Sequence, residues 1–275
     1  MMLEIPESKT IGLQAEKTLR GKIITEVFSP TNPHKFAFFN GDPSKYGNLL
    51  KGRQVNSAKG HGMFVDFTLD ENISFSIGEG TNMRYYLPSE EPPDKYQLLV
   101  VLDDGSFISF NVAMYGIIWA YSGIFDNKYH KVSLDSLSPL DDKFDELFFD
   151  GILRNSPKDI SAKALIATEQ RIPGVGNGVL QDILFKAGVH PRRKKSSMSD
   201  SEKSRLFKSL KTTLKTMTDL GGRDTEKDFF GNNGGYKTIL SKNSVNHPCP
   251  NCGDLVRKEP YLGGAVYFCP TCQKP

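Results

Sequence analysis

Short runs of alternating or continuously apolar residues, separated by turn signals, dominate the first 125 residues of the chain. Four such runs lie at residues 22–28, 62–69, 96–102 and 106–112, with turn-forming triplets at 40–42, 70–72 and 103–105. This pattern predicts antiparallel strands that form a sandwich or a barrel. Residues 8–19 differ, because their apolar positions recur at helical spacing and predict an amphipathic helix over one edge of the sheets.

The period of the apolar positions becomes helical between residues 137 and 220. Ser199 or Asp200 precedes the last helical stretch, with Glu202 at the spacing of a capping box. Gly188 and Gly221 follow apolar rows and are predicted to end their helices. Residues 221–245 are rich in Gly and Asn, which predicts a long loop before the end of the chain.

A glycine-rich turn, Ile-Pro-Gly-Val-Gly-Asn at residues 172–177, directly precedes a predicted helix. The first N–H groups of a helix have no partner within it, so the turn around Gly176 can offer them to a phosphate. Asn177 adds a side-chain donor, and Arg192 and Arg193 open a basic run after the next turn. Such a turn is weak evidence alone and gains weight from the basic run.

All four cysteines lie in the last 27 residues. Cys249 and Cys252 form one CxxC, Cys269 and Cys272 form another, and sixteen residues separate the two pairs. This is the spacing of a four-thiolate zinc site; two disulfides are the alternative, which a reducing compartment disfavours. Four thiolates leave no open coordination position, so we expect one structural Zn²⁺ that stabilises a short hairpin.

The net charge of +3 divides unevenly along the chain. Residues 1–150 hold 14 Lys and Arg against 21 Asp and Glu, whereas residues 151–275 hold 21 against 11. A basic half fits a polyanionic partner, although a solvated helical surface would give the same balance. No apolar run reaches the ~18 residues of a membrane span, and the N-terminus lacks the pattern of a signal peptide, so we expect a cytoplasmic protein.

The order of these parts resembles the formamidopyrimidine-DNA glycosylase and endonuclease VIII family of base-excision repair enzymes. The segments that carry the resemblance are LEIPES at 3–8, IPGVGNGVLQDILFKAGVHP at 172–191, GGRDTEKDFFGNNGGY at 221–236 and the terminal Cys₄ pattern. It implies an α+β fold with an antiparallel β-sandwich domain over residues 1–130, a helical helix–two-turn–helix domain over 131–240 and a zinc finger hairpin over 241–275. It also implies a monomer that binds damaged or abasic duplex DNA and everts the damaged base.

The family's reacting groups are only partly matched. Its N-terminal proline, whose amine forms a Schiff base at the sugar, aligns with Leu3, while Glu4 and Glu7 match its acid/base glutamate and the rest of that motif. The free α-amine of Met1, or of Met2 if translation starts there, is the substitute nucleophile that we predict.

Other positions of the family's DNA-contacting groups also differ. The family's hairpin lysine aligns with His61, beside Lys59, and its zinc-finger arginine aligns with Gly264. Glu79 and Ala113 stand where the family inserts methionine and arginine into the duplex. Tyr115 can still wedge between bases, and the phosphate-binding Asn177 is kept.

Three functions follow from this comparison. The favoured one is a DNA glycosylase and AP lyase that uses another amine, with Glu4, Glu7 and His61 as candidate catalytic residues. A DNA-binding protein that has lost the chemistry is the second, although two carboxylates have no evident use in a dead site. The third is a cleft that now binds a nucleotide or RNA, lined by His61 and residues 82–86. The carboxylates could instead cap the first helix.

Overall fold

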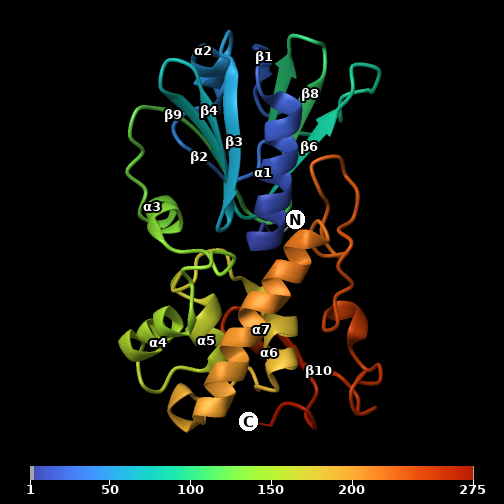
Figure 1. The fold of residues 1–275 in the computed structure, drawn as a ribbon. Coiled ribbons are helices and arrows are strands. Elements are labelled where there is room, and N and C mark those ends of the chain that lie inside the picture. Colours follow the sequence, from blue (N-terminus) through green and yellow to red (C-terminus); the bar gives the residue numbers. More distant parts are fainter. Residues whose placement is uncertain (1–2, 275) are drawn as a thin grey trace.

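A computed structural model describes residues 3–274 of the chain, which form two stacked halves (Figure 1). The upper half is built from β-strands and one long helix, and the lower half from helices and a C-terminal hairpin. Each half has its own apolar core, and a third, smaller cluster surrounds the cysteines. The domain boundaries expected after residues 130 and 240 stay a prediction.

The upper half contains two β-sheets. One has four strands in the order β1-β7-β8-β6, and the other has five in the order β2-β9-β5-β4-β3. All pairs are antiparallel except β2 with β9, which are parallel. The strands are β1 (Ile24–Phe28), β2 (Ala37–Phe39), β3 (Val55–His61), β4 (Phe64–Leu69), β5 (Ile73–Ile77), β6 (Thr81–Tyr86), β7 (Leu98–Leu102), β8 (Phe107–Val112) and β9 (Gly116–Ser122).

Helix α1 (Ile5–Leu19) lies against the sheets and begins three residues before the predicted start. Pro6 suits the first turn of a helix, where a backbone N–H has no partner in any case. The helix approaches β3 so closely that a Cβ on Gly12 would lie 2.2 Å from the backbone nitrogen of Gly60. These two glycines therefore fix the position of the chain's first helix. A short helix, α2 (Tyr46–Leu50), covers another part of the sandwich.

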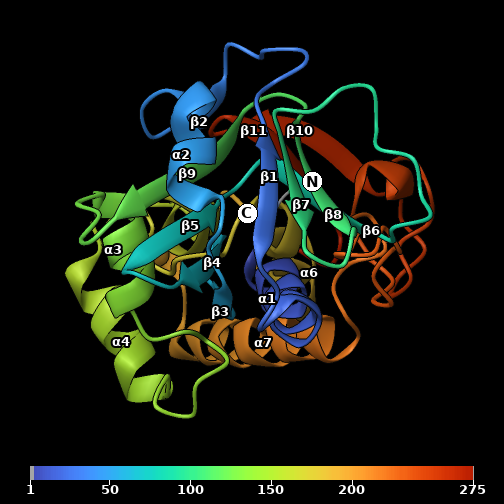
Figure 2. The same cartoon turned by 90° about the horizontal axis from the view of Figure 1, so that it is seen from above.

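Helix α3 (Lys128–Asp135) lies beside the sandwich and contacts β4 and β9, and the lower half contains α4 (Glu146–Asn155), α5 (Ala162–Ala167), α6 (Asn177–Ala187) and α7 (Asp200–Asp219). The predicted capping box of α7 is confirmed, since the side chain of Ser199 and that of Glu202 each accept from the other's backbone N–H. Gly188 ends α6 in the left-handed conformation, at a φ of 67°. Seen from above, α6 and α7 lie beneath the sandwich and α1 (Figure 2).

The C-terminal segment folds back along α6 as an antiparallel hairpin of β10 (Arg257–Tyr261) and β11 (Gly264–Phe268). The α+β class predicted from the sequence is thus confirmed, with its β-rich half, helical half and four-cysteine end. Within residues 3–274, no helix is both long and apolar enough to cross a membrane.

Candidate active site

A pocket of about 480 Å³ lies where the two halves and the C-terminal hairpin meet. The first described residues, the β8–β9 turn, the start of α6 and the hairpin turn all contribute to its wall. The lining residues are Leu3, Glu4, Met63, Glu79, Gly80, Ala113, Met114, Tyr115, Lys163, Ala167, Thr168, Gly174, Val175, Gly176, Asn177, Glu226, Leu262, Gly263 and Gly264. Elements distant in sequence therefore share one cavity, the arrangement expected of a ligand site.

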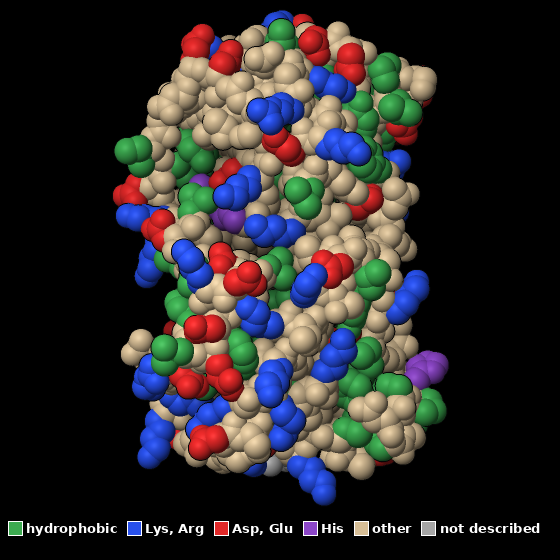
Figure 3. All heavy atoms as spheres, viewed as in Figure 1, with side chains coloured by type: hydrophobic (Ala, Val, Ile, Leu, Met, Phe, Trp, Pro, Cys, Tyr) green, Lys and Arg blue, Asp and Glu red, His purple; other side chains and the backbone are tan. Residues whose placement is uncertain are grey.

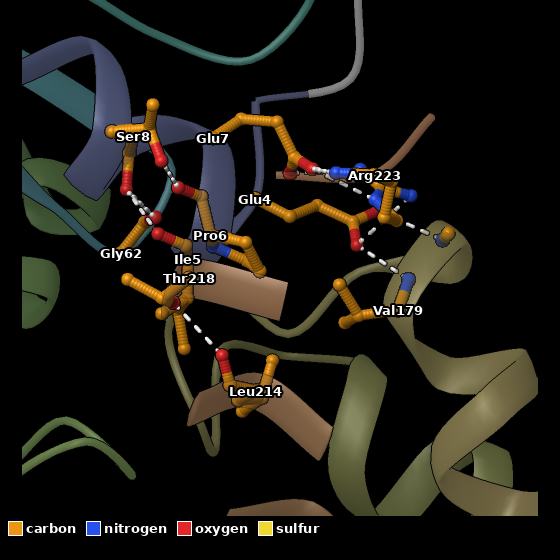
Figure 4. A network of polar contacts seen from close by, with 12 residues as sticks. Glu4, Ile5, Pro6, Glu7, Ser8, Gly62, Val179, Leu214, Thr218 and Arg223 are labelled. Atoms are coloured by element: carbon orange, nitrogen blue, oxygen red, sulfur yellow. Dashed lines mark hydrogen bonds and ion pairs between the residues drawn. The ribbon is translucent and has the colours of Figure 1, made fainter. Parts of the chain in front are cut away.

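Glu4 is the most constrained acid in this wall. Its two carboxylate oxygens accept hydrogen bonds from the backbone N–H groups of Gly178 and Val179, at 2.8 and 2.7 Å. Figure 4 shows the side chain reaching from the start of α1 to the first turn of α6. Burial raises the pKa of Glu4 to about 7, against the lowering effect of Arg223 and the two backbone donors. A carboxyl with such a pKa can both donate and accept a proton near neutral pH.

The backbone donors that the sequence analysis assigned to a phosphate are therefore occupied by Glu4. This corrects the expected role of the glycine-rich turn, and it also corrects the alternative that Glu4 caps the first helix, because Glu4 caps α6 and makes no side-chain cap to α1. Gly176 itself is required by this contact, since a Cβ there would lie 2.5 Å from the Glu4 carboxylate. A glycine at position 176 therefore makes room for the Glu4 carboxylate, not for a bound phosphate.

Glu7 lies outside the pocket lining and forms a buried ion pair instead. Nε and Nη2 of Arg223 each donate to a different oxygen of the Glu7 carboxylate at 2.9 Å, and the Arg223 backbone N–H adds a third bond at 3.1 Å. Nη1 of Arg223 lies 3.6 Å from Glu4 (Figure 4). Arg223 thus joins Glu7 to Glu4, and a catalytic role for Glu7 stays a prediction. No local pattern in the sequence distinguishes Arg223 from the other arginines.

His61 does not line the pocket either. Its Nε2 lies 2.8 Å from the Asp66 carboxylate, its Nδ1 lies 3.0 Å from Ser133, and Nε2 of His130 contacts the same carboxylate at 2.9 Å. The two histidines hold the pKa of Asp66 well below its usual range, although burial opposes this. His61 therefore fastens α3 to the β3–β4 hairpin, which contradicts its expected place at the reacting sugar.

Tyr115 and Asn177, the residues expected to contact DNA, both line the pocket. Burial first, then the charge of Glu79 and a hydrogen bond to it, raise the pKa of Tyr115. Nδ2 of Asn177 donates to the carbonyl of Ala265 in β11 at 2.9 Å, while its Oδ1 is buried without a partner. Asn177 therefore joins α6 to the hairpin before any ligand is bound.

Two of the basic residues predicted to contact DNA make contacts within the protein itself. Arg192 bonds Glu259 at 3.2 Å and stacks over the ring of Tyr261, and Arg193 bonds Glu202 at 3.3 Å. Lys59 is exposed on β3. One face of the molecule carries basic and acidic side chains interspersed over both halves (Figure 3).

The four cysteines converge at the base of the C-terminal hairpin. Sulfur atoms of Cys249 and Cys272 lie 3.8 Å apart, and those of Cys252 and Cys269 lie 3.4 Å apart. Both separations exceed the ~2.05 Å of a disulfide and lie near the ~3.8 Å edge of a tetrahedron with metal–sulfur bonds of ~2.3 Å. The donor set thus fits a single metal ion and does not fit two disulfides.

Lys163 is a pocket residue that the sequence analysis missed. It lies in the first turn of α5, only 3% exposed, and its Nζ donates to the carbonyl of Tyr261 at 2.6 Å. Burial lowers its pKa. The segment SAKALIATEQ predicts a helix, and nothing in it indicates that this lysine faces a cavity formed with the distant hairpin. Met1 and Met2, the predicted nucleophiles, lie outside the described residues.

Comparison with known proteins gives one consistent set of relatives. No protein-family model matches the chain. The chain is 26% identical to the formamidopyrimidine-DNA glycosylase of Bacillus subtilis over 282 residues, covering 99% of both proteins. It is also 26% identical to the enzyme of that name from Thermus thermophilus over 284 residues, covering 99% of this chain and 98% of the relative.

Solved structures agree with these sequence relatives in fold. The Thermus thermophilus MutM (Fpg) protein superposes with a TM-score of 0.80 at 24% identity, covering 98% of each chain. The Lactococcus lactis Fpg in complex with abasic-site DNA superposes with a TM-score of 0.82 at 21% identity, covering 99% of this chain and all of the other. Over its full length, the chain is therefore similar in sequence to the formamidopyrimidine-DNA glycosylases and shares the fold of the Fpg structures.

Proposed function

We propose that this chain is a base-excision repair protein that binds duplex DNA and acts on damaged bases or abasic sites as a DNA glycosylase and AP lyase. The observation that carries the proposal is Glu4, a buried acid with a pKa near 7 in the wall of the inter-half pocket. The relatives of the chain are formamidopyrimidine-DNA glycosylases, and one of the solved structures with this fold, the Lactococcus lactis Fpg, is bound to abasic-site DNA.

The pocket supports chemistry on an everted nucleotide. Removal of a base requires a nucleophile at C1′ of the sugar and a group that exchanges protons with the sugar or the leaving base. Glu4 suits the second task, because its carboxyl is held by two backbone donors and by Arg223. The first task needs an amine, which forms a covalent imine with the sugar. Tyr115 and Asn177 line the same pocket, where the Tyr115 ring can stack on a neighbouring base and the Asn177 amide can donate to a phosphate once its Nδ2 leaves Ala265.

The four cysteines complete the proposal as the ligands of one structural Zn²⁺. Zinc would hold the base of the hairpin whose turn, residues 262–264, lines the pocket. With four thiolate ligands it supplies no open position for a substrate, so its contribution is to the shape of the wall. We further propose that the protein acts as a monomer in the cytoplasm.

Borohydride trapping on a duplex with one abasic site tests the enzyme proposal, because borohydride reduces an imine to a stable covalent adduct. We expect the unmodified chain to form the adduct and Glu4→Gln to form it at least tenfold more slowly, given the ~10²–10⁴-fold contribution of a general acid–base group. Glu26→Gln is the matched control, because Glu26 pairs with Lys51 on the surface of the sandwich.

Two results would contradict the enzyme proposal. Salt-sensitive duplex binding without any adduct or base release would indicate the non-catalytic DNA-binding protein. Neither binding nor adduct would indicate a cleft that takes another ligand. Equal adduct formation by Glu4→Gln and the parent chain would leave the lyase activity but remove Glu4 from it.

A further inference from the structure

The pocket contains one side-chain amine among its described lining residues, that of Lys163. Glu4 and Leu3 line the same cavity, so this amine lies in the same compartment as the acid and as the position of the family's proline. Lys59, two residues from the position of the family's hairpin lysine, is exposed on β3 and does not line the pocket. Position alone therefore distinguishes Lys163 from the other described lysines.

The surroundings of Lys163 favour its neutral form. Its side chain is buried, and no ion pair among residues 3–274 includes it. By contrast, the pKa of Lys22 is raised by hydrogen bonds to Asp104 and Tyr85 even though burial opposes this. Burial without a carboxylate partner disfavours the ammonium ion and lowers the pKa of Lys163, as is typical of lysines that form imines.

The side chain of Lys163 makes one hydrogen bond, and its acceptor lies next to the hairpin turn. Its Nζ donates to the carbonyl of Tyr261, the last residue of β10, and the next three residues line the pocket. Leu262 and Gly263 both have positive φ, at 47° and 74°, and Leu262 is half exposed. The amine is thus held at the pocket wall by one backbone acceptor, which a substrate sugar can replace.

We propose that the Nζ amine of Lys163 is the nucleophile that forms the imine with the damaged nucleotide. This inference rests on the proposed glycosylase and lyase function and names its reacting group. With an intact nucleotide, the nitrogen lone pair forms a bond to C1′, the bond from C1′ to the base breaks, and the base leaves with that electron pair and takes up a proton. Loss of the ammonium proton and opening of the sugar ring then give the imine.

An abasic site joins the same reaction after the step in which the base leaves. Its aldehyde condenses with the neutral amine, and one water molecule leaves. Removal of a C2′ proton from the imine then expels the 3′-phosphate, so the C3′–O bond breaks and the strand is cut. Glu4 lies in the same pocket to exchange protons with the sugar oxygen. A lysine nucleophile accounts for the loss of the N-terminal proline, since the α-amine is no longer required.

Peptide mapping of the borohydride adduct tests this assignment. The full-length chain is trapped on an abasic-site duplex, digested with nuclease and protease, and the modified peptide is identified by mass spectrometry. We expect the sugar remnant on the peptide that contains Lys163. Lys163→Arg should lower trapping at least a hundredfold and leave duplex affinity within about threefold, because arginine keeps a long side chain that donates hydrogen bonds but does not form an imine. Lys51→Arg, a surface lysine paired with Glu26, is the control and should trap normally.

The outcomes separate this inference from the proposed function. An adduct on the N-terminal peptide would overturn the assignment of Lys163 and leave the glycosylase and lyase proposal standing. No adduct with the parent chain would overturn both. Because the mapping uses the unmodified protein, it decides the assignment even if Lys163→Arg does not fold.

Discussion

Replacing Arg223 by methionine removes the guanidinium that joins Glu7 to Glu4 while keeping a long side chain in the same space. Arg223 is 2% exposed and donates to both oxygens of Glu7. Its removal leaves two buried carboxylates without their cation, a change that typically costs about 3–5 kcal/mol. We expect Arg223→Met to lower the free energy of unfolding by that amount at pH 8.

The loss should depend on pH in a defined direction. The pKa of Glu4 in the folded protein, about 7, lies above its ordinary 4.5, so folding favours the protonated form. Stability from this group is full below pH 4.5 and declines as the pH rises through 7. Arg223 is the strongest influence that lowers this pKa, so its removal moves the window upward. At pH 5 the Glu4 carboxyl is protonated, and the cost should shrink to about 1–2 kcal/mol of lost hydrogen bonds.

Urea unfolding followed by the fluorescence of Trp119, the only tryptophan, measures this loss. Arg20→Met is the matched control, because Arg20 is 71% exposed in its pair with Glu16 and such pairs contribute about 0–1 kcal/mol. The double change Glu7→Gln with Arg223→Met should cost less than Arg223→Met alone, since it removes one buried charge. A loss below about 1 kcal/mol at pH 8, or a loss equal at pH 5 and pH 8, would refute the reasoning.

Three further experiments test the site and the elements that support it. Asn177→Ala should weaken binding of all duplex sequences alike, by about 1.5–3 kcal/mol for a lost bond to a phosphate, and sequence-selective weakening in a binding titration would contradict this. Asp182→Asn should lower the free energy of unfolding by about 1–3 kcal/mol, because the Asp182 carboxylate accepts from Tyr236 and from two backbone N–H groups; an unchanged urea midpoint would contradict it. A thiol reagent should release one equivalent of zinc per chain, and a folded hairpin with Cys269→Ser that holds no metal would contradict a structural role.

Local signals in the sequence were sufficient for much of the fold. The strands at 24–28, 64–69, 98–102 and 107–112, the capping box at Ser199 and the left-handed Gly188 all follow from neighbouring residues. The four cysteines were identified because metal ligation imposes a strict spacing. The parallel pairing of β2 with β9 was not predicted, because it joins residues about 80 positions apart and a short strand carries little pattern of its own.

The candidate site was less accessible to sequence analysis, because its contacts are long-range. Glu4 meets the start of α6 across 174 positions, and Lys163 meets the hairpin across 98. The glycine-rich turn was correctly placed before a helix, but a sequence cannot tell whether the free donors of that helix will face a phosphate or a buried carboxylate. Likewise, His61 aligns with a reacting lysine, but in the structure its Nε2 is hydrogen-bonded to the Asp66 carboxylate.

The occupation of the α6 N-terminus by Glu4 changes where the phosphates of a bound duplex can lie. The pocket wall carries Glu4, Glu79 and Glu226 against the one amine of Lys163, so its acidic groups disfavour an anion inside it. An uncharged base or sugar is not subject to this repulsion. The unpartnered Oδ1 of Asn177 cannot donate to a phosphate, and its Nδ2 must leave Ala265 before it can. We therefore expect the hairpin to shift when DNA binds, with the phosphates held outside the pocket and the everted nucleotide inside it.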